Sequence, residues 1–321
     1  RTGDGVVFNN RSSVPVTVDV VHPTRDDDWA QIEFDSGRTK YNPDTFGPKQ
    51  HLQEVWNLSS FDDTVQPVIS DGSVFVVQEP YVDGTRVEVV RSYDETTGAL
   101  EWEFNVSAQN RVLAGSPTVA DDTVYLYATP NGAFTSGAVY DASVFALDAS
   151  DGTLRWRHDT PMNYSRISND RAPVVDDGLV YVAGARVDGT DDENASVLAL
   201  DAGTGTTAWR YDVNGDGTTE AFYAVAVESG TLVASLHAQD APGSVSFDDT
   251  LVAIDAATGG AVWSTSNLTV DLVDPPVVRN GTVYVVNESG PETLFALDLA
   301  DGSQQWEFVP LDQSTETDTW R

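Results

Sequence analysis

Short runs in which apolar and polar residues alternate recur along the chain, and small turn residues separate them. Five pairs of such runs flank a two-residue turn, at residues 67–77, 117–127, 173–183, 225–235 and 276–286. Alternation with a period of two predicts strands, and Asp-Gly or Asn-Gly between two runs predicts a tight hairpin turn. Each pair is therefore expected to form a β-hairpin.

A second unit follows each hairpin: a strand that ends in Asp, a turn with Gly four residues later, and a strand with Trp eight residues after the Asp. The copies are SYDETTGALEW, ALDASDGTLRW, ALDAGTGTTAW, AIDAATGGAVW and ALDLADGSQQW, which end at Trp102, Trp156, Trp209, Trp263 and Trp306. A hairpin plus this unit makes four short antiparallel strands in about 45 to 55 residues, the period of a propeller blade. The expected fold class is all-β, a β-propeller of four-stranded antiparallel blades, with five complete blades and partial blades at the termini.

The spacing within the second unit has mechanical reasons, seen in ALDASDGTLRW. Gly152 is expected at a positive φ, which only glycine adopts at low cost, and Asp148 can accept hydrogen bonds from the turn amides that follow it. The small Ala146 leaves room for a neighbouring ring, and Trp156 is expected to wedge between blades and bury on the order of 200 Å². We therefore assign these residues a structural role in blade docking and no chemistry.

The pattern A-x-D-x-x-T-G-x-x-x-W resembles the tryptophan-docking motif of the PQQ-like (quinoprotein-type) β-propeller repeat family. The resemblance covers residues 29–321, and residues 28–48 resemble the segment before blade one in secreted archaeal members. It implies a PQQ-like propeller over residues 29–321, after an N-terminal β-strand extension over residues 1–28. It leaves function open, because members range from quinone-dependent dehydrogenases to the non-catalytic propeller lipoprotein of outer-membrane protein assembly.

The residues that the dehydrogenases of this family use are mostly missing. Those enzymes hold PQQ with Ca²⁺, a catalytic Asp and usually a vicinal disulfide, whereas this sequence contains no Cys. Its four His are scattered without metal-ligand spacing, and no G-x-S-x-G elbow or phosphate-cradling loop is present. We therefore expect neither catalytic residues nor bound PQQ.

The charge of the chain restricts its partners and its environment. Asp and Glu number 51 against 17 Lys and Arg, for a net charge of −34, which excludes nucleic-acid binding by phosphate neutralisation. The 40% hydrophobic content is too high for a disordered acidic chain. Molar salt shortens the Debye length to about 3 Å and screens such a surface. An extreme halophile is favoured over an acidic mesophilic source, also because Lys is scarce.

Asn-x-Ser/Thr sequons indicate the compartment. Eight are present, where composition alone predicts about two, at Asn10, Asn57, Asn105, Asn163, Asn194, Asn267, Asn280 and Asn287. They predict an extracellular or cell-surface glycoprotein with N-linked glycans; the alternative is a turn-rich composition. No apolar run approaches the ~18 residues of a membrane span, and no signal peptide precedes Arg1.

Residues 212–220, DVNGDGTTE, have the spacing of a compact Ca²⁺ loop. Asp212, Asn214, Asp216 and Glu220 can donate side-chain oxygens, and Thr218 can donate its carbonyl. The loop is not an EF-hand, because Tyr occupies the twelfth position. It resembles D-x-D-x-D-G-x-x-D loops of other propellers, and the alternative is a solvated acidic turn.

The sequence leaves two questions open: which face of the propeller binds a partner, and how the blades at the two ends of the chain are completed. Tight turns are expected on one face and longer connections on the other, where binding usually resides but where glycans would screen it. Trp56 looks like the last strand of another blade, and residues 317–321 look like the lead-in to one. Either the chain is truncated, or the alternating runs at residues 5–10 and 14–21 complete the blade or pair with a neighbouring subunit.

The leading hypothesis is a non-enzymatic, extracellular, glycosylated, calcium-dependent propeller that serves as a binding or assembly scaffold of the cell surface. Its partners would be other cell-surface proteins or copies of itself. One alternative is a structural subunit of a filament or surface layer joined by β-strand exchange. The other is a PQQ-dependent dehydrogenase, which would carry quinone in the central channel.

Overall fold

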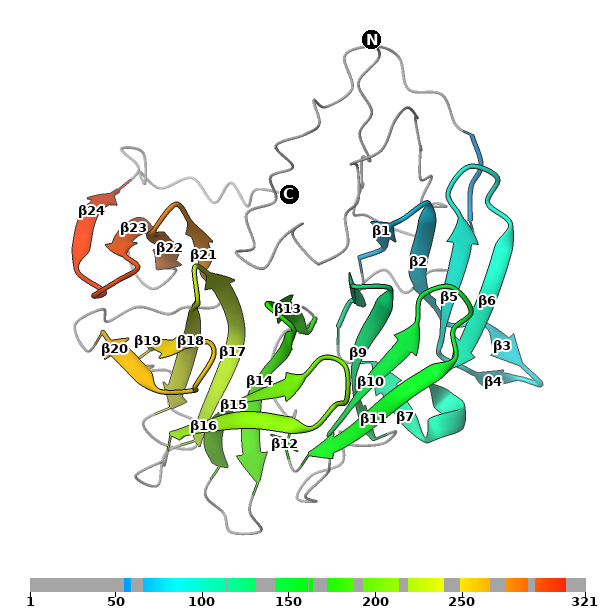
Figure 1. Ribbon diagram of the computed structural model, residues 1–321, viewed down its shortest axis with the longest axis horizontal. Helices are drawn as coiled ribbons and strands as arrows, with labels where there is room; N and C mark the ends of the chain where they lie inside the picture. Colours follow the sequence, from blue (N-terminus) through cyan, green and yellow to red (C-terminus); the bar gives the residue numbers. More distant parts are fainter. Residues whose placement is uncertain are drawn as a thin grey trace, which may run out of the picture.

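Five antiparallel β-sheets stand side by side in an arc, as blades of a propeller (Figure 1). The computed structural model describes residues 55–58, 66–113, 115–130, 142–160, 162–163, 172–187, 193–213, 219–239, 249–265, 275–287 and 292–309. The predicted propeller with five four-stranded blades is confirmed over these ranges. The predicted extension at residues 1–28 lies outside them.

The first two blades contain the strands of the first two repeats. Blade one consists of β1 (Val68–Ser70), β2 (Ser73–Gln78), β5 (Val89–Asp94) and β6 (Leu100–Asn105). Blade two consists of β8 (Thr118–Ala120), β9 (Thr123–Pro130), β10 (Ala142–Asp148) and β11 (Leu154–Thr160), and β7 (Arg111–Leu113) also pairs with β9.

The remaining three blades repeat this order. Blade three consists of β13 (Val174–Asp176), β14 (Leu179–Val187), β15 (Glu193–Asp201) and β16 (Thr207–Val213), with β12 (Met162–Asn163) also paired to β14. Blade four consists of β17 (Thr219–Glu228), β18 (Thr231–Gln239), β19 (Thr250–Asp255) and β20 (Ala261–Ser264). Blade five consists of β21 (Val277–Arg279), β22 (Thr282–Asn287), β23 (Thr293–Asp298) and β24 (Gln304–Phe308).

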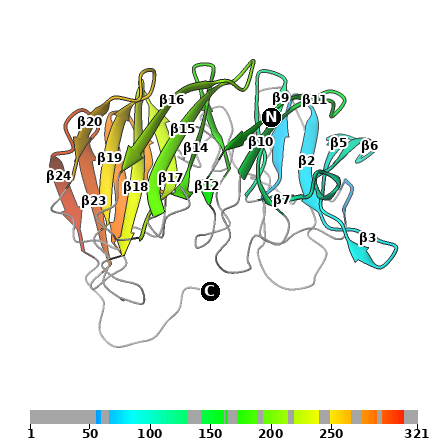
Figure 2. The same cartoon turned by 90° about the horizontal axis from the view of Figure 1, so that it is seen from below.

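The two tight turns of each blade lie together on one face. In all five hairpins both turn residues have positive φ, for example Asp71 at 47° and Gly72 at 80°, as mirror-image turns require. A backbone hydrogen bond ties the two turns of a blade, such as Glu95 N–H to Gly72 O at 2.8 Å. These turns form the upper edge in Figure 2 and face the viewer in Figure 1. We call the side that carries these turns the turn face.

The opposite side carries the longer connections and is called the connection face. In blade one the link from β2 to β5 forms a small hairpin, β3 (Tyr81–Val82) and β4 (Thr85–Arg86). This hairpin projects from the lower edge of the molecule in Figure 2. The link from blade one to blade two contains the short 3₁₀ helix η1 (Ser107–Gln109).

The hydrophobic core is a set of layers between blades. Buried clusters join blade one to two, two to three, three to four and four to five. The sheets of blades one to four therefore bury apolar side chains on both faces, unlike a sheet with one solvated face. A polar contact adds to the last of these layers: the two Glu228 carboxylate oxygens accept the N–H groups of Asn280 and Gly281, both at 2.7 Å.

The small residue two positions before the motif Asp, Ala146 in blade two, lies between two aromatic residues of its own sheet. Ala146 pairs with Tyr125 on one side and Trp156 on the other. The two rings approach each other across it, with centroids 5.9 Å apart. Both rings thus belong to the same blade as Ala146, and the register shift that follows it, between Ala146 and Leu147, recurs at this place in every blade.

Two turn glycines of blade three both have a positive φ, but only one of them lies under a tryptophan ring. Comparing alanine substitutions at the two positions therefore measures the cost of the ring contact separately from the cost of the backbone conformation. Gly178 and Gly205 have φ of 75° and 69°. A Cβ on Gly178 would meet nothing within 4 Å, whereas one on Gly205 would lie 2.5 Å from Trp156. We expect Gly178→Ala to lower the free energy of unfolding by about 1 kcal/mol and Gly205→Ala by a further ~1 to 3 kcal/mol. Denaturant unfolding measures both variants, and equal losses would show that the ring contact adds nothing.

Candidate functional site

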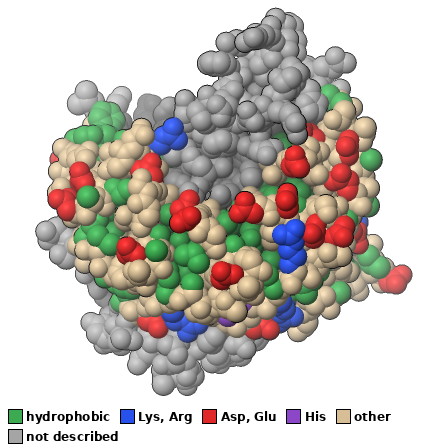
Figure 3. All heavy atoms as spheres, in the orientation of Figure 1, with side chains coloured by type: hydrophobic (Ala, Val, Ile, Leu, Met, Phe, Trp, Pro, Cys, Tyr) green, Lys and Arg blue, Asp and Glu red, His purple; other side chains and the backbone are tan. Residues whose placement is uncertain are grey.

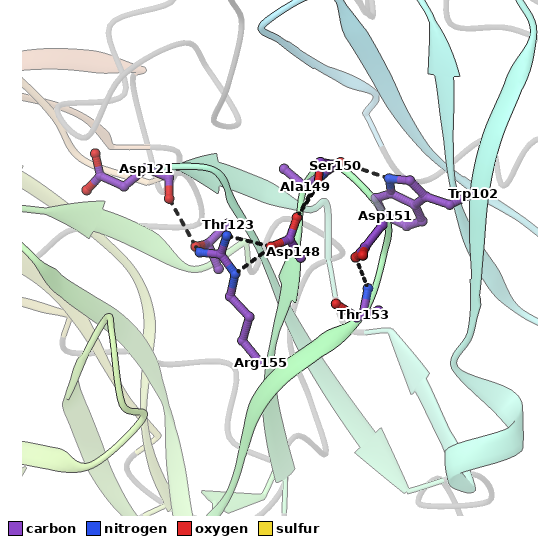
Figure 4. A network of polar contacts seen from close by, with 9 residues as sticks. All are labelled: Trp102, Asp121, Thr123, Asp148, Ala149, Ser150, Asp151, Thr153 and Arg155. Carbon is purple, nitrogen blue, oxygen red and sulfur yellow. Dashed lines mark hydrogen bonds and ion pairs between the residues drawn. The ribbon is translucent and has the colours of Figure 1, made fainter.

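Four of the five repeat tryptophans, Trp102, Trp156, Trp209 and Trp263, are seated on the next blade. A Cβ on Gly152 would lie 2.6 Å from the Trp102 ring, so the indole covers this glycine closely. The Trp102 Nε1–H donates to the carbonyl oxygen of Ala149 at 2.8 Å (Figure 4). The same donor reaches the carbonyl after the motif Asp in three further contacts, from Trp156 to Ala202, Trp209 to Ala256 and Trp263 to Leu299.

The motif Asp folds the turn that receives the ring. Asp148 Oδ1 accepts the N–H of Ser150 at 2.9 Å and its hydroxyl at 2.5 Å, while Oδ2 pairs with Arg155 at 2.8 Å (Figure 4). The hydrogen bond from the Ser150 hydroxyl and those from Arg155 lower the pKa of Asp148 to about 2. Arg155 also donates to Thr123, so the carboxylate links β9, β10 and β11.

The other motif carboxylates do the same. Asp201 and Asp255 each accept the hydroxyl and N–H of the threonine three residues later, and these bonds lower the pKa of both carboxyls. Asp94 and Asp298 also accept turn amides. These carboxylates of the repeat therefore hold the turns in which they lie.

Two tryptophans depart from the sequence-based assignment. Trp56, which was not among the predicted docking residues, sits on Gly98 and donates to the Glu95 carbonyl at 2.7 Å. Pro48 and Leu52 stand where the motif requires Asp and Gly, so the tryptophan itself was the available signal. Conversely, Trp306 is 44% exposed, whereas Trp102 is 7% exposed. The expectation of a buried wedge is wrong for Trp306 in this structure.

The predicted calcium loop is only partly described. Asp212 lies near the end of β16, where its Oδ1 accepts the Ser196 hydroxyl at 2.6 Å. Glu220 lies on β17 of the next blade. Asn214, Asp216 and Thr218 lie outside the described residues. Within the described ranges no three His, Asp or Glu side chains gather as a metal-binding group, and the calcium site stays a prediction.

The Ser196–Asp212 pair has a counterpart in blade two. Ser143 and Asp159 occupy the same register, at 2.5 Å. Partial burial raises the pKa of Asp159, but hydrogen bonds from Ser143 and Arg157 outweigh it, so the pKa is lowered overall. Arg111 on β7 adds a second cation, 3.6 Å from the carboxylate.

Blade three differs at the register position of that second cation. Arg111 pairs with Pro130, two residues beyond the partner of Ser143. The corresponding residue on β12 is Met162, which pairs with Arg186. At this register position blade three therefore has a methionine where blade two has an arginine.

The sequons differ in exposure. Asn57, Asn105 and Asn280 are exposed, whereas Asn287 is 9% exposed and counts as buried. Asn163 and Asn194 lie on β12 and β15, while Asn10 and Asn267 lie outside the described residues. A buried side chain is a poor acceptor after folding, so exposure favours the first three sites; attachment of glycans itself stays a prediction.

The surface has one prevailing charge. Acidic side chains are scattered over the described part of the turn face, with few basic ones among them (Figure 3). None of the described segments forms a helix of the length and hydrophobicity that a membrane crossing requires.

Comparison with known proteins finds related propellers. A family model described as outer membrane protein assembly factor BamB matches residues 50–191 and 193–317. Proteins of that name from Moranella endobia (strain PCIT) and Yersinia pestis are 23% and 24% identical, over 75% and 70% of this chain. These alignments cover 54% and 49% of the relatives, so the chain spans about half the length of the curated relatives it matches.

A solved structure supports the same fold. Quinohemoprotein alcohol dehydrogenase from Comamonas testosteroni superposes with a TM-score of 0.62 at 18% identity. The superposition covers 89% of this chain and 49% of that chain. At this identity the likeness concerns the fold alone.

The Asp148 turn should respond to acid. A pKa of about 2, below the ordinary 3.8, means that the ionised carboxylate stabilises the fold above about pH 4 and that this contribution is lost as the pH falls through about 2. We expect Asp148→Asn to lower Tm at pH 7, and the difference from wild type to shrink between pH 4 and pH 2. Asp151→Asn, in the same turn, is the matched control. A difference that stays constant down to pH 2 would contradict the assignment.

Proposed function

The chain belongs to the PQQ-like β-propeller family, and from this premise we propose that it is a non-enzymatic scaffold of the cell envelope that binds other proteins. Support comes from the family model and the two BamB relatives, which are named as assembly factors.

The observation that carries the binding proposal is the β3–β4 hairpin on the connection face. At its start Tyr81 is 75% exposed and Val82 52% exposed. The hairpin is closed at its base by a hydrogen bond from Val87 N–H to Pro80 O at 3.0 Å. An aromatic and an aliphatic side chain held on a rigid scaffold can supply the apolar anchors of a protein interface.

We place this scaffold outside the cell. The sequon excess supports a glycosylated, extracellular protein, and glycopeptide mass spectrometry of native material tests that point. The net charge of −34 supports a high-salt environment, because dissolved ions screen repulsion within the chain and between partners. Partners are then envelope proteins that present an apolar surface to the connection face.

The hairpin proposal is tested by the double variant Tyr81→Ser/Val82→Ser in the full-length protein. Both side chains are exposed, so we expect an unchanged Tm and a loss of at least about tenfold in cross-linking to envelope proteins in the producing cells. Leu154→Ser, at a residue 47% exposed on β11, is the matched control. Unchanged cross-linking of the double variant would remove the hairpin as the contact. Dye reduction with an alcohol by PQQ-loaded protein would contradict the non-enzymatic assignment.

We also propose that Ca²⁺ binds residues 212–220. Asp212 would be a ligand oriented by Ser196, together with Asn214, Asp216, Thr218 and Glu220. Oxygen donors of this kind are those that Ca²⁺ prefers.

The calcium proposal predicts a variant whose effect depends on the metal. Asp212→Asn should lower Tm more in millimolar Ca²⁺ than in EDTA, because only the ion-loaded protein loses a metal ligand in addition to the contacts that Asp212 makes without the ion. Asp159→Asn, whose carboxylate meets Arg157 at 2.8 Å, should lower Tm equally in both. If Asp212→Asn has the same effect with and without Ca²⁺, there is no metal at this loop.

A further inference from the structure

A turn of blade five is held by a carboxylate of blade four. Asn280 and Gly281 form the tight turn between β21 and β22, and both have a positive φ, 52° and 74°. The N–H of Asn280 donates to Oε1 of Glu228 and the N–H of Gly281 donates to Oε2, both at 2.7 Å. Glu228 is the last residue of β17, whose end lies beside β21 in Figure 1. Both backbone N–H groups of this turn are therefore bound by one side chain of another blade.

Asn280 and Gly281 are also a chemically reactive pair. The backbone nitrogen that follows an asparagine can attack the side-chain carboxamide carbon, and a glycine hinders this attack least because it has no Cβ. A bond forms between Gly281 N and Asn280 Cγ, the bond from Cγ to the amide nitrogen breaks, and ammonia leaves with the proton of the Gly281 N–H. Water then opens the cyclic imide to aspartate or isoaspartate. Both residues are exposed, so water reaches the turn.

The contact with Glu228 opposes this reaction at the attacking atom. Gly281 N can attack only after it gives up the proton that it donates to Glu228 Oε2. The peptide must also turn toward the Asn280 side chain, which breaks hydrogen bonds to a carboxylate, and these are stronger than bonds between neutral groups. The negative charge of the carboxylate in addition disfavours a deprotonated nitrogen beside it. Each step toward the imide therefore costs more while the contact is in place.

The pairing of glutamate and asparagine occurs between these two blades in the part of the chain that the structure describes. Among the five described hairpin turns, only that of blade five begins with Asn, and the other four begin with Asp71, Asp121, Asp177 and Ser229. Glu228 stands directly before the turn of blade four, and the residues at the same place in the other hairpins are Ser70, Ala120, Asp176 and Arg279. The described Asn–Gly turn thus faces the one glutamate at this place.

The same turn supports a second contact between blades four and five. Gly281 O accepts the N–H of Leu299 at 2.9 Å, and the Leu299 carbonyl accepts the Nε1–H of Trp263 at 2.8 Å. Isoaspartate at position 280 adds a methylene group to the backbone of a two-residue turn. This shifts the N–H groups away from Glu228 and moves the backbone that positions Leu299.

We propose that Asn280 is a deamidation site that the Glu228 carboxylate protects, and that conversion of Asn280 loosens blade five from blade four. The observation that carries the proposal is that the N–H group that must react, that of Gly281, is bound to Glu228 at 2.7 Å. The inference is independent of the proposed scaffold function. A glycan on Asn280 would occupy the same side-chain nitrogen, so the test uses the full chain from a host without N-glycosylation.

The test compares the rate of Asn280 conversion in wild type, Glu228→Ala and Glu228→Gln at mildly alkaline pH, followed by peptide mass spectrometry. We expect conversion at least about tenfold faster in Glu228→Ala, because two hydrogen bonds to a charged group are lost. Glu228→Gln keeps one oxygen acceptor and should give an intermediate rate. Glu101→Ala is the matched control, because its carboxylate also accepts two hydrogen bonds but in blade one. The Asn–Gly pair at residues 131–132 supplies a reference rate in every sample.

The loosening of blade five is tested by ageing the protein. The Tm of wild type should fall as Asn280 converts, whereas Asn280→Gln, aged in parallel, should keep its Tm, because a glutamine amide forms the corresponding ring far more slowly. This comparison separates position 280 from the other Asn–Gly pairs of the sequence, at residues 131–132 and 214–215.

Each contrary outcome overturns the proposal. Equal rates in wild type and Glu228→Ala would show that the carboxylate gives no protection. Equal acceleration in Glu101→Ala would assign the effect to a general loss of stability. Conversion at residues 131–132 without conversion of Asn280 in Glu228→Ala would show that Asn280 is no deamidation site. An unchanged Tm after conversion of Asn280 would show that the turn does not hold the two blades together.

Discussion

The contact on which this fold depends is an indole ring lying over a turn glycine of the next blade. At five places a Cβ on that glycine would lie within 2.5 to 2.8 Å of the ring, and the glycine also has a positive φ. The position is thus restricted twice, by backbone geometry and by close approach. The Asp four residues earlier holds the turn, and the next carbonyl receives the indole N–H. The same Asp and Gly residues are therefore needed both to form the turn and to pack the indole ring of the preceding blade.

This requirement makes each blade depend on its neighbour. A four-stranded sheet with apolar side chains on both faces cannot bury them alone, so the core is divided into layers between blades, as in other repeat proteins. Glu228 of blade four also links the two blades, because its carboxylate accepts hydrogen bonds from two backbone N–H groups in a turn of blade five. Within the described part of the chain blade five has a neighbour on one side only, and Trp306 and Phe308 are exposed on its other face.

Features that depend only on residues within one repeat could be predicted from the sequence. Strand order, the positive φ of the turn glycines and the Asp-to-amide hydrogen bonds all follow from spacing over eleven residues. Features that depend on a neighbour could not be read in the same way. Trp56 docks although its own segment lacks the Asp and Gly of the motif, and Trp306 has the full motif yet remains exposed. Whether a tryptophan is buried is decided by the following blade, which spacing does not specify.

In the candidate site, too, some features follow from local residue spacing and others only from the pairing of strands. The predicted calcium loop was identified from side-chain spacing, but the Ser–Asp pair that contains Asp212 and recurs in blades two and three was seen only in the cross-strand register. Repetition also indicates where function can reside, since residues that recur in each blade are used for docking. The proposed binding is therefore best sought at positions that differ between blades, such as the hairpin bearing Tyr81 or the position where blade two has Arg111 and blade three has Met162. In a propeller of near-identical blades, function is therefore to be sought where the repeat is broken.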